Sequence, residues 1–575
     1  MLRRIFSYMK EYKKYAWLAL ICIGVEVVLE IMVPKLMADL IDIGVTNSDV
    51  PYIINKGIQM AVCAVAALIL GVGSARFSAL AGQGLGANIR KAEYEKLQSY
   101  SFSNIDHFSV SSLVTRLTSD VTNIQNAVST GMRPFGRSPV MLIFATTLAF
   151  KINSTLALVF LVALPVLAVL LIIIIINVGP RYGRMQGAVD LVNRCIEENL
   201  TAVRVVKSYV RGDYEIEKFR NVNDNLKNES EKAFGIAVLN MPAMQFVMYS
   251  TILGILLIGG RLINSGQMMI GQLTSFLSYV LLILNSLMMM SNVFLLMTRS
   301  LASAERIMKV IDEPIDITDE NARNIEVKKG EIEFNHVWFK YNETAKEYVL
   351  SDVSFHINAG QTVGIIGQTG SSKTTLIQLI PRLYDASKGE IKIDGINVKE
   401  YPVRHLRDAI SVVLQKNTLF SGSLIDNLRW GNENATLDEI KEACSIACVD
   451  EFIDRLPGGF DAEMGQEGVN VSGGQKQRIC IARAILKKPK VLILDDSTSA
   501  VDTATEGKIR NALAKKLPDM TKIIIAQRIS SVRHADQIII MDGGCVNAIG
   551  THESLLKTNK IYQEIYESQK EGADL

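Results

Sequence analysis

The chain has few of the residues that build disulfide frameworks or metal centres. Its 575 residues include only seven cysteines and six histidines. Cys22 and Cys63 fall in long apolar runs, and we expect the other five cysteines in the cytoplasm, where thiols stay reduced. Cys444 and Cys448 lie four residues apart, but no histidine or further cysteine stands close to them in the sequence. We therefore interpret this pair as small buried hydrophobes, not as metal ligands.

An excess of charge is also missing. Lysine and arginine together number 61, aspartate and glutamate together number 59, and the formal net charge is +2. No basic stretch with interleaved aromatic residues stands out. The composition therefore predicts no nucleic-acid partner.

Apolar residues are abundant instead, at 49% of the chain. A chain of this length and hydropathy is too long for one domain and too apolar for an ordinary soluble enzyme. Long apolar runs crowd the first three hundred positions, and the rest mixes strand-like and helix-like patterns with charges. We expect a membrane domain over 1–312, a linker over 313–330 and a second domain over 331–575.

The membrane domain is expected to be all-α. A span needs roughly twenty mostly apolar residues, and six segments qualify: about 15–40, 57–80, 130–150, 155–179, 236–260 and 272–298. Basic residues precede the first span without a cleavable signal pattern, and they enrich the long connections near 81–129 and 180–235. The positive-inside rule then predicts a multi-pass protein with both termini in the cytoplasm. We expect the two long connections to be helical extensions.

Charged residues also occur inside the expected spans. Glu26 and Glu30 lie four residues apart on the first span and so share a helix face. Intramembrane carboxylates usually face a cavity or a partner, which leaves open a cation-binding role, a structural hydrogen bond or a place near the outer interface. Arg133 and Arg137 repeat the spacing on the third span, where contact with headgroups or with the helix bundle is expected.

The expected second domain contains a phosphate-binding motif. Gly367–Thr374 reads GQTGSSKT between a strand-like run and a helix-like run, so backbone N–H groups can wrap a phosphate at a helix N-terminus. We expect Lys373 to neutralise the β- and γ-phosphates of ATP and Thr374 to ligate Mg²⁺. The expected nucleotide contacts in this stretch are Gly367, Gln368, Thr369, Gly370, Ser371, Ser372, Lys373, Thr374 and Thr375.

Ser372 departs from this motif, because a glycine normally precedes the lysine. If the position needs a positive φ, a residue other than glycine costs on the order of 1–3 kcal/mol. ATP binding would then be weakened, unless neighbouring residues hold the loop.

The acidic pair in VLILDD departs from the pattern of an efficient ATPase. Asp495 ends an apolar strand and is expected to hold the Mg²⁺ shell, whereas Asp496 stands where a hydrolytic enzyme of this kind needs glutamate. A general base contributes typically 10²–10⁴ in rate, and a misplacement of about 1 Å removes about a hundredfold. Gln527 stands where a histidine would be expected, and glutamine cannot carry charge or shuttle a proton. The sequence therefore predicts slow hydrolysis.

With VSGGQKQR at 471–478, these motifs resemble a half-transporter of the ABC exporter superfamily, and in particular the degenerate-site subunit of heterodimeric bacterial multidrug exporters. The resemblance implies a type IV exporter membrane domain of six transmembrane helices fused to a cytoplasmic α/β P-loop ATPase domain. It also implies roles for residues outside the phosphate loop: adenine stacking for Tyr341, a link from Mg²⁺ to the membrane helices for Gln415, a dimer-interface loop at Asp502, and a signature at Ser472, Gly473, Gly474 and Gln475 that reaches the partner's γ-phosphate.

The resemblance further implies ATP and Mg²⁺ as cofactors, a second half-transporter as partner, lipid contact in the plasma membrane and a hydrophobic or amphipathic small molecule as cargo. Segments 108–121 and 210–219 look like coupling helices, the second docking on the opposite chain. A lipid or peptide translocase is the close alternative, which the residues do not separate from drug export. A non-transporting ATP sensor that regulates a partner is a third reading, against which the intact signature argues.

Overall fold

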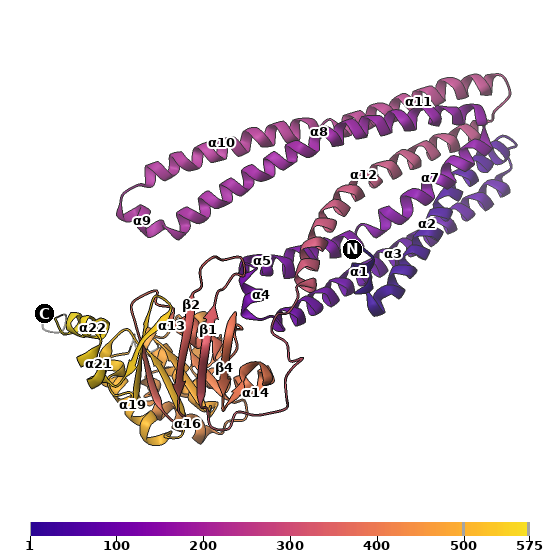
Figure 1. Ribbon diagram of the computed structural model, residues 1–575. Coiled ribbons are helices and arrows are strands. Elements are labelled where there is room, and N and C mark those ends of the chain that lie inside the picture. Colours follow the sequence, from indigo (N-terminus) through magenta and orange to yellow (C-terminus); the bar gives the residue numbers. More distant parts are fainter. Residues whose placement is uncertain (1, 497–500, 572–575) are drawn as a thin grey trace. The chain divides into compact units, whose positions relative to one another are not determined.

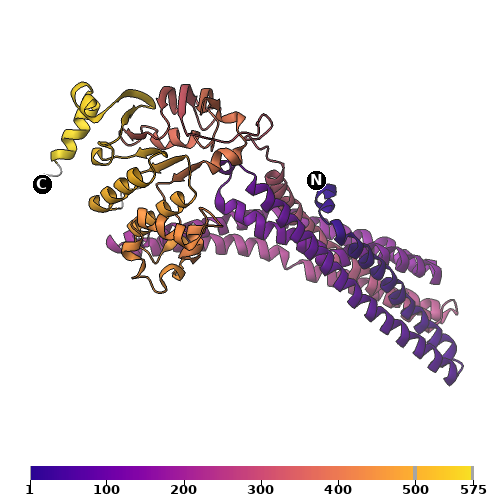
Figure 2. The same ribbon diagram turned by 90° about the horizontal axis from the view of Figure 1, so that it is seen from below.

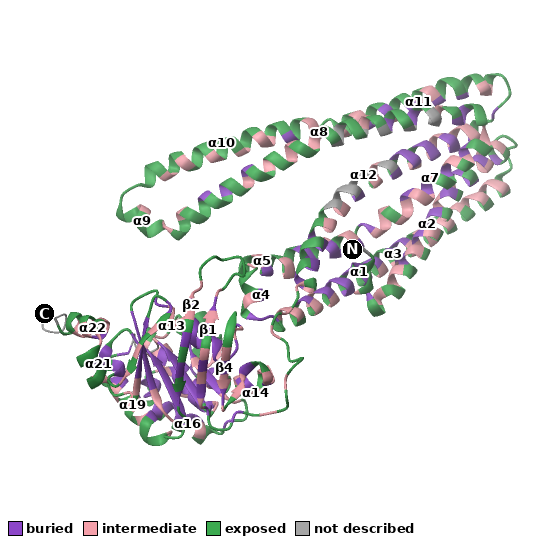
Figure 3. Cartoon of the chain, viewed as in Figure 1, coloured by how far each residue is buried: buried purple, intermediate pink, exposed green. Residues whose placement is uncertain are grey.

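The computed structural model describes residues 2–496 and 501–571, apart from some side chains within its helices (Figure 1). The chain forms two compact units. The first unit comprises residues 1–97 and 111–312, and the second comprises 98–110 and 313–575. Figure 3 shows that buried residues concentrate on the strands of the second unit, whereas long helices of the first unit carry mostly exposed and half-buried residues.

The first unit is built from long helices, as apolar runs of this length require in a membrane. The principal helices are α2 (Lys13–Asp39), α3 (Val50–Gln98), α7 (Met132–Ile152), α8 (Ser154–Thr201), α10 (Gly212–Ala237), α11 (Asn240–Asn264) and α12 (Ile270–Asp312). Among the described residues, five stretches are long and apolar enough to cross a membrane: Lys10–Val45, Val50–Gln98, Val110–Ile152, Gly212–Asn264 and Ile270–Met290. The remaining expected span, 155–179, lies within α8, where several side chains fall outside the description.

The second long connection forms a helical hairpin. The ends of α8 and α10 run side by side, joined at the tip by the short helix α9 (Val203–Ser208) (Figures 1 and 2). The first turn of α10 carries Asp213 and Glu215, which favour the positive end of the helix dipole. Tyr209 and Val210 project from the tip with exposed fractions of 75% and 88%. Two large apolar side chains so exposed are typical of a surface that another chain covers.

In the membrane unit, the two glutamates of α2 contact the two arginines of α7. Arg133 Nη2 donates to Glu26 Oε1 at 2.6 Å, and Arg137 lies 3.4 Å from Glu26 and 2.6 Å from Glu30. The matching four-residue spacings on α2 and α7 make these contacts possible. Gly71 of α3 leaves room for the cluster, because a Cβ there would lie 3.2 Å from Glu26 Oε1. Two carboxylates therefore neutralise two guanidinium groups inside the helix bundle, which supports the structural interpretation of Glu26 and the bundle contact of the arginines.

The second unit contains a six-stranded sheet in the order β12-β11-β3-β10-β9-β6. Its strands are β3 (Thr362–Ile366), β6 (Ile410–Val413), β9 (Val491–Asp495), β10 (Thr521–Ile525), β11 (Gln537–Asp542) and β12 (Cys545–Gly550). All neighbours are parallel except β11 and β12. Strands buried on both faces need continuous apolar runs, and β9 and β10 are buried throughout.

A smaller antiparallel sheet lies in the same unit, in the order β2-β1-β4-β5. Its strands are β1 (Ile332–Phe339), β2 (Leu350–Ile357), β4 (Lys388–Ile393) and β5 (Ile396–Asn397). Buried residues from both sheets share one hydrophobic core that includes Phe334, Ile365 and Ile493. The short helix α4 (Phe102–Asp106) also belongs to this unit.

Removing Glu26 should destabilise the membrane unit strongly. Its side chain is 7% exposed, and breaking a buried ion pair costs about 3–5 kcal/mol. Without Glu26, the cluster keeps two guanidinium groups but only the Glu30 carboxylate, which remains beside Arg137, so one positive charge is left uncompensated. We expect Glu26→Ala to lower the midpoint of thermal unfolding of the detergent-solubilised chain. Glu198→Ala is the matched control, since it breaks an exposed pair with Lys218 worth about 1 kcal/mol or less. Equal midpoints for the two variants would contradict the structural role of the cluster.

Candidate functional site

The phosphate loop begins where β3 ends and leads into α13 (Lys373–Leu379). Gly367 has no space for a side chain, because a Cβ would lie 2.2 Å from the carbonyl oxygen of Met541. Gly370 has a φ of 86°, which favours glycine. The loop is therefore shaped by close backbone packing at its start and by a left-handed turn in its middle.

Ser372 adopts a φ of 67° and a ψ of 22°, in the left-handed region. The condition for strain at this position is therefore met, and a residue other than glycine costs roughly 1–2 kcal/mol there. Ser372 immediately precedes the first residue of α13, so its backbone sets how the N–H groups of this helix face the loop.

Lys373 is held against the loop that it is expected to serve. Its Nζ donates to the carbonyl oxygens of Gly367 and Gln368 at 2.9 and 2.8 Å and to Ser371 Oγ at 3.2 Å. Burial lowers the pKa of Lys373, and the nearby carboxylates of Asp496 and Asp495 partly offset this effect. An ammonium at the N-terminus of α13 makes this end of the site positive.

Thr374 and Asp495 form a candidate Mg²⁺ site. Thr374 Oγ1 donates to Asp495 Oδ1 at 3.2 Å, whereas Asp495 Oδ2 is buried without a hydrogen-bond partner among the described residues. Burial raises the pKa of Asp495 and Asp496 raises it further, while the Thr374 hydroxyl and Lys373 lower it. A hydroxyl beside a buried carboxylate oxygen with a free coordination position is the oxygen donor set that Mg²⁺ prefers. The residues therefore fit this ion.

Asp496 and Gln527 meet beside this pair. β9 and β10 are parallel neighbours with Asp495 in register with Ile525, so the residues that follow them emerge at the same edge of the sheet. Gln527 Nε2 donates to Asp496 Oδ2 at 2.9 Å. Burial raises the pKa of Asp496, whereas Lys373 and hydrogen bonds from Gln415 and Gln527 lower it.

These residues surround one cavity of about 300 Å³. Most of the expected site residues line it, and Ile525 at the end of β10 joins them: Thr369, Gly370, Ser371, Ser372, Lys373, Thr374, Thr375, Gln415, Asp495, Asp496, Ile525 and Gln527. Gly367 and Gln368 contribute through the carbonyl oxygens that accept from Lys373. The cavity thus combines backbone N–H groups, one ammonium and two carboxylates, as binding of a nucleoside triphosphate with a divalent cation requires.

Tyr341 lies near the far end of the phosphate loop, where its hydroxyl is 2.9 Å from Thr375 Oγ1. Tyr341 is 47% exposed, and its ring packs edge-on against the ring of Tyr384, with centroids 5.2 Å apart. Tyr384 in turn donates a hydrogen bond of 2.7 Å to Asp106 Oδ2 of α4. The sequence did not point to Tyr384 or Asp106, because no local motif marks either residue.

The signature residues lie elsewhere in the unit. Ser472 caps α18 (Gly473–Leu486), with its backbone N–H donating to Gln475 Oε1 at 2.9 Å and its Oγ accepting from the Gln475 N–H at 3.3 Å. Asp502 caps α19 (Thr503–Lys516) in the same way, accepting from the Thr505 N–H at 2.9 Å. Neither the signature residues nor Asp502 are among the described residues that line the cavity around Lys373.

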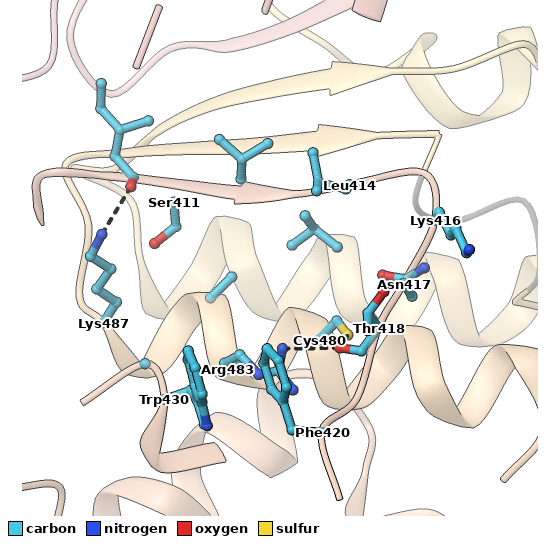
Figure 4. A pocket seen from close by; sticks show the side chains of 15 residues that line it. Ser411, Leu414, Lys416, Asn417, Thr418, Phe420, Trp430, Cys480, Arg483 and Lys487 are labelled. Carbon is cyan, nitrogen blue, oxygen red and sulfur yellow. Dashed lines mark hydrogen bonds between the residues drawn. The ribbon is translucent and has the colours of Figure 1, made fainter. Parts of the chain in front are cut away.

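A second cavity, of about 360 Å³, lies between β6 and α18 (Figure 4). The rings of Phe420 and Trp430 stack beside it, with centroids 4.2 Å apart and planes 13° apart. Arg483 Nη1 donates to the Thr418 carbonyl oxygen at 3.2 Å. Phe420 and Trp430 are 43% and 65% exposed, so this groove presents an aromatic surface beside the half-buried guanidinium of Arg483.

A helical membrane unit joined in one chain to a nucleotide-binding α/β unit defines an ATP-driven membrane transporter. Residues 16–287 match the family model of the ABC transporter transmembrane region, and residues 350–499 match that of the ABC transporter. The chain belongs to the ABC transporter family and is a half-transporter of the exporter type.

Three curated relatives match over most of their length. The uncharacterized ABC transporter ATP-binding protein YfiB of Bacillus subtilis (strain 168) is 38% identical over the whole of both chains. YgaD of the same organism, provisionally named a multidrug export ATP-binding/permease protein, is 32% identical over 84% of this chain and 83% of its own. An ATP-dependent lipid A-core flippase of Desulfotalea psychrophila is 32% identical over 85% of each chain.

A bacterial Atm1-family ABC exporter, solved with ATP bound, has the same fold. It superposes with a TM-score of 0.82 at 22% identity over 98% of both chains. The expected fold class is therefore confirmed: a helical ABC membrane domain is fused to an α/β ABC ATPase domain, and the chain is a multi-pass membrane protein. The ATPase domain implies ATP binding, and a half-transporter works as a dimer with a second half.

Asp495→Asn should uncouple ATP binding from Mg²⁺. Loss of a residue that merely orients a metal ligand lowers metal affinity roughly 10–100-fold. Mg²⁺ raises the ATP affinity of the solubilised wild-type chain, and we expect this increase to be smaller in the variant by at least that factor. Because burial disfavours the charged carboxylate, the midpoint of thermal unfolding in EDTA should rise. The control is Asp438→Asn, an exposed carboxylate in the first turn of α16 (Leu437–Ile446). An unchanged Mg²⁺ effect in Asp495→Asn would exclude this residue as a ligand.

Proposed function

We propose that the chain is the degenerate-site subunit of a heterodimeric exporter that moves hydrophobic or amphipathic small molecules out of the cell. The observation that carries the proposal is the hydrogen bond between Asp496 and Gln527 inside the cavity of Lys373. At the two positions where an efficient ATPase would place a glutamate and a histidine, this chain has a shorter carboxylate and a neutral amide bound to one another.

This pairing accounts for slow hydrolysis in physical terms. To activate water, the Asp496 carboxylate would have to reach one methylene further and release the Gln527 amide. Gln527 can donate a hydrogen bond to a γ-phosphate but cannot take up a proton. Mg²⁺, which neutralises charge on the β- and γ-phosphates when bound, would be held by Thr374 and Asp495, with Gln415 nearby. ATP would therefore bind and remain bound.

The intact signature gives the chain a catalytic task at the partner's site. Ser472 and the glycines after it lie at the exposed N-terminus of α18, where N–H groups and the helix dipole favour an anion. They do not line this chain's own cavity, so we infer that they bind the γ-phosphate of ATP on a partner that carries the glutamate and histidine. Asp502 would lie in the same interface.

Coupling to the membrane would use both helical connections. The exposed Tyr209 and Val210 at the tip of the α8–α10 hairpin are complementary to an aromatic groove such as that of Phe420 and Trp430 (Figure 4). We infer that each chain's tip docks in the partner's groove. ATP would favour the closed dimer by contacting both ATPase domains, and hydrolysis at the competent site would release it. Basic cytoplasmic connections support an orientation with both termini inside the cell.

The nature of the cargo is the finer part of the proposal. The relative named for multidrug export supports small amphipathic molecules, and the lipid A-core flippase supports a lipid translocase as the alternative. ATP-dependent uptake by inverted vesicles that contain this chain and its partner separates the two, with a fluorescent amphipathic dye in one arm and a labelled lipid in the other. Absence of both activities would favour an ATP sensor.

Restoring the two missing residues should restore hydrolysis. We expect Asp496→Glu with Gln527→His to raise single-turnover hydrolysis at this site by about 100-fold or more, because a positioned base contributes that much. The rise should exceed the product of the single effects, since residues that act as a unit are non-additive. The measurement uses a heterodimer whose partner has its catalytic glutamate replaced by glutamine.

The left-handed backbone of Ser372 is a second possible cause of slow hydrolysis. If its backbone strain limits hydrolysis as well, Ser372→Gly should be needed in addition. If the triple variant remains inactive, Asp496 and Gln527 do not account for slow hydrolysis at this site. The partner's signature would then limit the rate of hydrolysis. Brisk hydrolysis by the purified wild-type chain, free of partner, would contradict the assignment directly.

The signature should matter more to turnover than this chain's own phosphate loop. In the heterodimer, we expect Ser472→Ala or Gly474→Asp to lower steady-state ATPase severalfold more than Lys373→Ala does. The reason is that the signature would complete the fast site, whereas Lys373 binds ATP at the slow one. Equal losses from all three variants would argue against this division of labour between the two sites.

A further inference from the structure

The last described helix, α22 (Lys560–Glu571), contacts the backbone of the segment that carries Gln527. Gln569 Nε2 donates to the Gln527 carbonyl oxygen at 2.7 Å, and Gln569 Oε1 accepts from the Ile529 N–H at 2.8 Å. One side-chain amide thus pairs with a carbonyl and an N–H two residues apart. Two hydrogen bonds of this kind fix the orientation of the segment as well as its distance from α22.

Helix α22 is itself firmly anchored. Tyr562 is fully buried and its hydroxyl lies 2.7 Å from Nδ1 of His552, which precedes it in α21 (His552–Thr558). The rings of Tyr562 and Tyr566 both pack against His552, with centroids 5.7 and 5.9 Å away. Gln569 therefore extends from a fixed support, and its hydrogen bonds can hold the Gln527 segment in place.

The Gln527 segment needs such support. The described residues enclose a further cavity of about 310 Å³, lined by Asp496, Glu506, Ala526, Gln527, Arg528, Ser531 and Gln569. Asp496 and Gln527 also line the nucleotide cavity, so the hydrogen-bonded pair adjoins both spaces. Where packing is open, backbone position depends on hydrogen bonds, and Gln569 supplies two of them.

We propose that Gln569 is a positioning residue for the nucleotide site. By fixing the backbone at Gln527, it directs the Gln527 amide toward Asp496 and toward the terminal phosphate of a bound triphosphate. The inference rests on the proposed function in one respect, namely that Gln527 faces the γ-phosphate. A residue at the C-terminal end of the ATPase domain would then help the site to distinguish ATP from ADP.

The test compares ATP and ADP affinities of the full chain in lipid nanodiscs with Mg²⁺ present. Gln569→Met keeps much of the side-chain volume but removes both hydrogen bonds. We expect it to weaken ATP binding about fivefold, as the loss of roughly one hydrogen bond to a ligand does, and to leave ADP binding within about twofold. Gln569→Glu should behave similarly, because its carboxylate cannot donate to the Gln527 carbonyl oxygen. Gln563→Met is the matched control, since Gln563 lies on the same helix and its side-chain amide donates to the Leu556 carbonyl oxygen, away from the Gln527 segment.

The Gln527→Ala variant tests the role of Gln527 separately from the positioning role of Gln569. If Gln527→Ala lowers the preference for ATP over ADP and both Gln569 variants leave it unchanged, the positioning role is wrong while the role of Gln527 stands. Equal weakening of ATP and ADP binding by Gln569→Met would show a general structural contribution and would also overturn the inference. If Gln527→Ala itself leaves the preference unchanged, Gln527 does not face the γ-phosphate and the inference fails with it. A lowered preference in Gln527→Ala and in both Gln569 variants, with Gln563→Met unchanged, is the supporting result.

Discussion

The nucleotide site depends on the parallel pairing of β3, β10 and β9 at the centre of one sheet. These strands end at a common edge, so the residues that follow them come together although they are far apart in the sequence. Lys373, Asp495 and Gln527 owe their proximity to this pairing, in which β10 is in parallel register with both β3 and β9. Electrostatics then refines the arrangement, because burial disfavours each charge alone and the opposite charges across the cavity offset part of that cost.

Sequence reasoning locates candidate residues where the chemistry is encoded close together in the chain, and the structure brings most of the expected nucleotide-site residues to one cavity. The phosphate loop, the acidic pair and the apolar spans are such patterns, and the left-handed Ser372 shows that even a departure from a motif can be interpreted in advance. Contacts such as that of Tyr384 with Asp106, 278 positions apart, leave no local signal. The cluster of glutamates and arginines in the membrane unit could be predicted only in part. Their spacings were visible, but periodicity alone does not say which helix faces which.

The ATPase unit includes a piece of the first helical connection. Asp106 and Phe102 of α4 contact Tyr384, by a hydrogen bond of 2.7 Å and by rings 6.0 Å apart. Tyr384 packs in turn against Tyr341, the residue expected to stack on adenine. Tyr341 is thus connected to α4 through the ring of Tyr384 and one hydrogen bond.

The proposed asymmetry between the two sites is consistent with the limits on what a bound ligand can do. ATP shifts a conformational equilibrium only by the difference in its affinity for the two states, and a site that never hydrolyses can hold a dimer closed but cannot reopen it. Reopening must come from a second site at which ATP is consumed. The proposed subunit, with Asp496 in place of a glutamate and with the signature at Ser472, would fit that requirement, because it would retain one nucleotide and complete the site of the other. A pure sensor would need the first property alone, and the capped, exposed start of α18 would then have no ligand to bind.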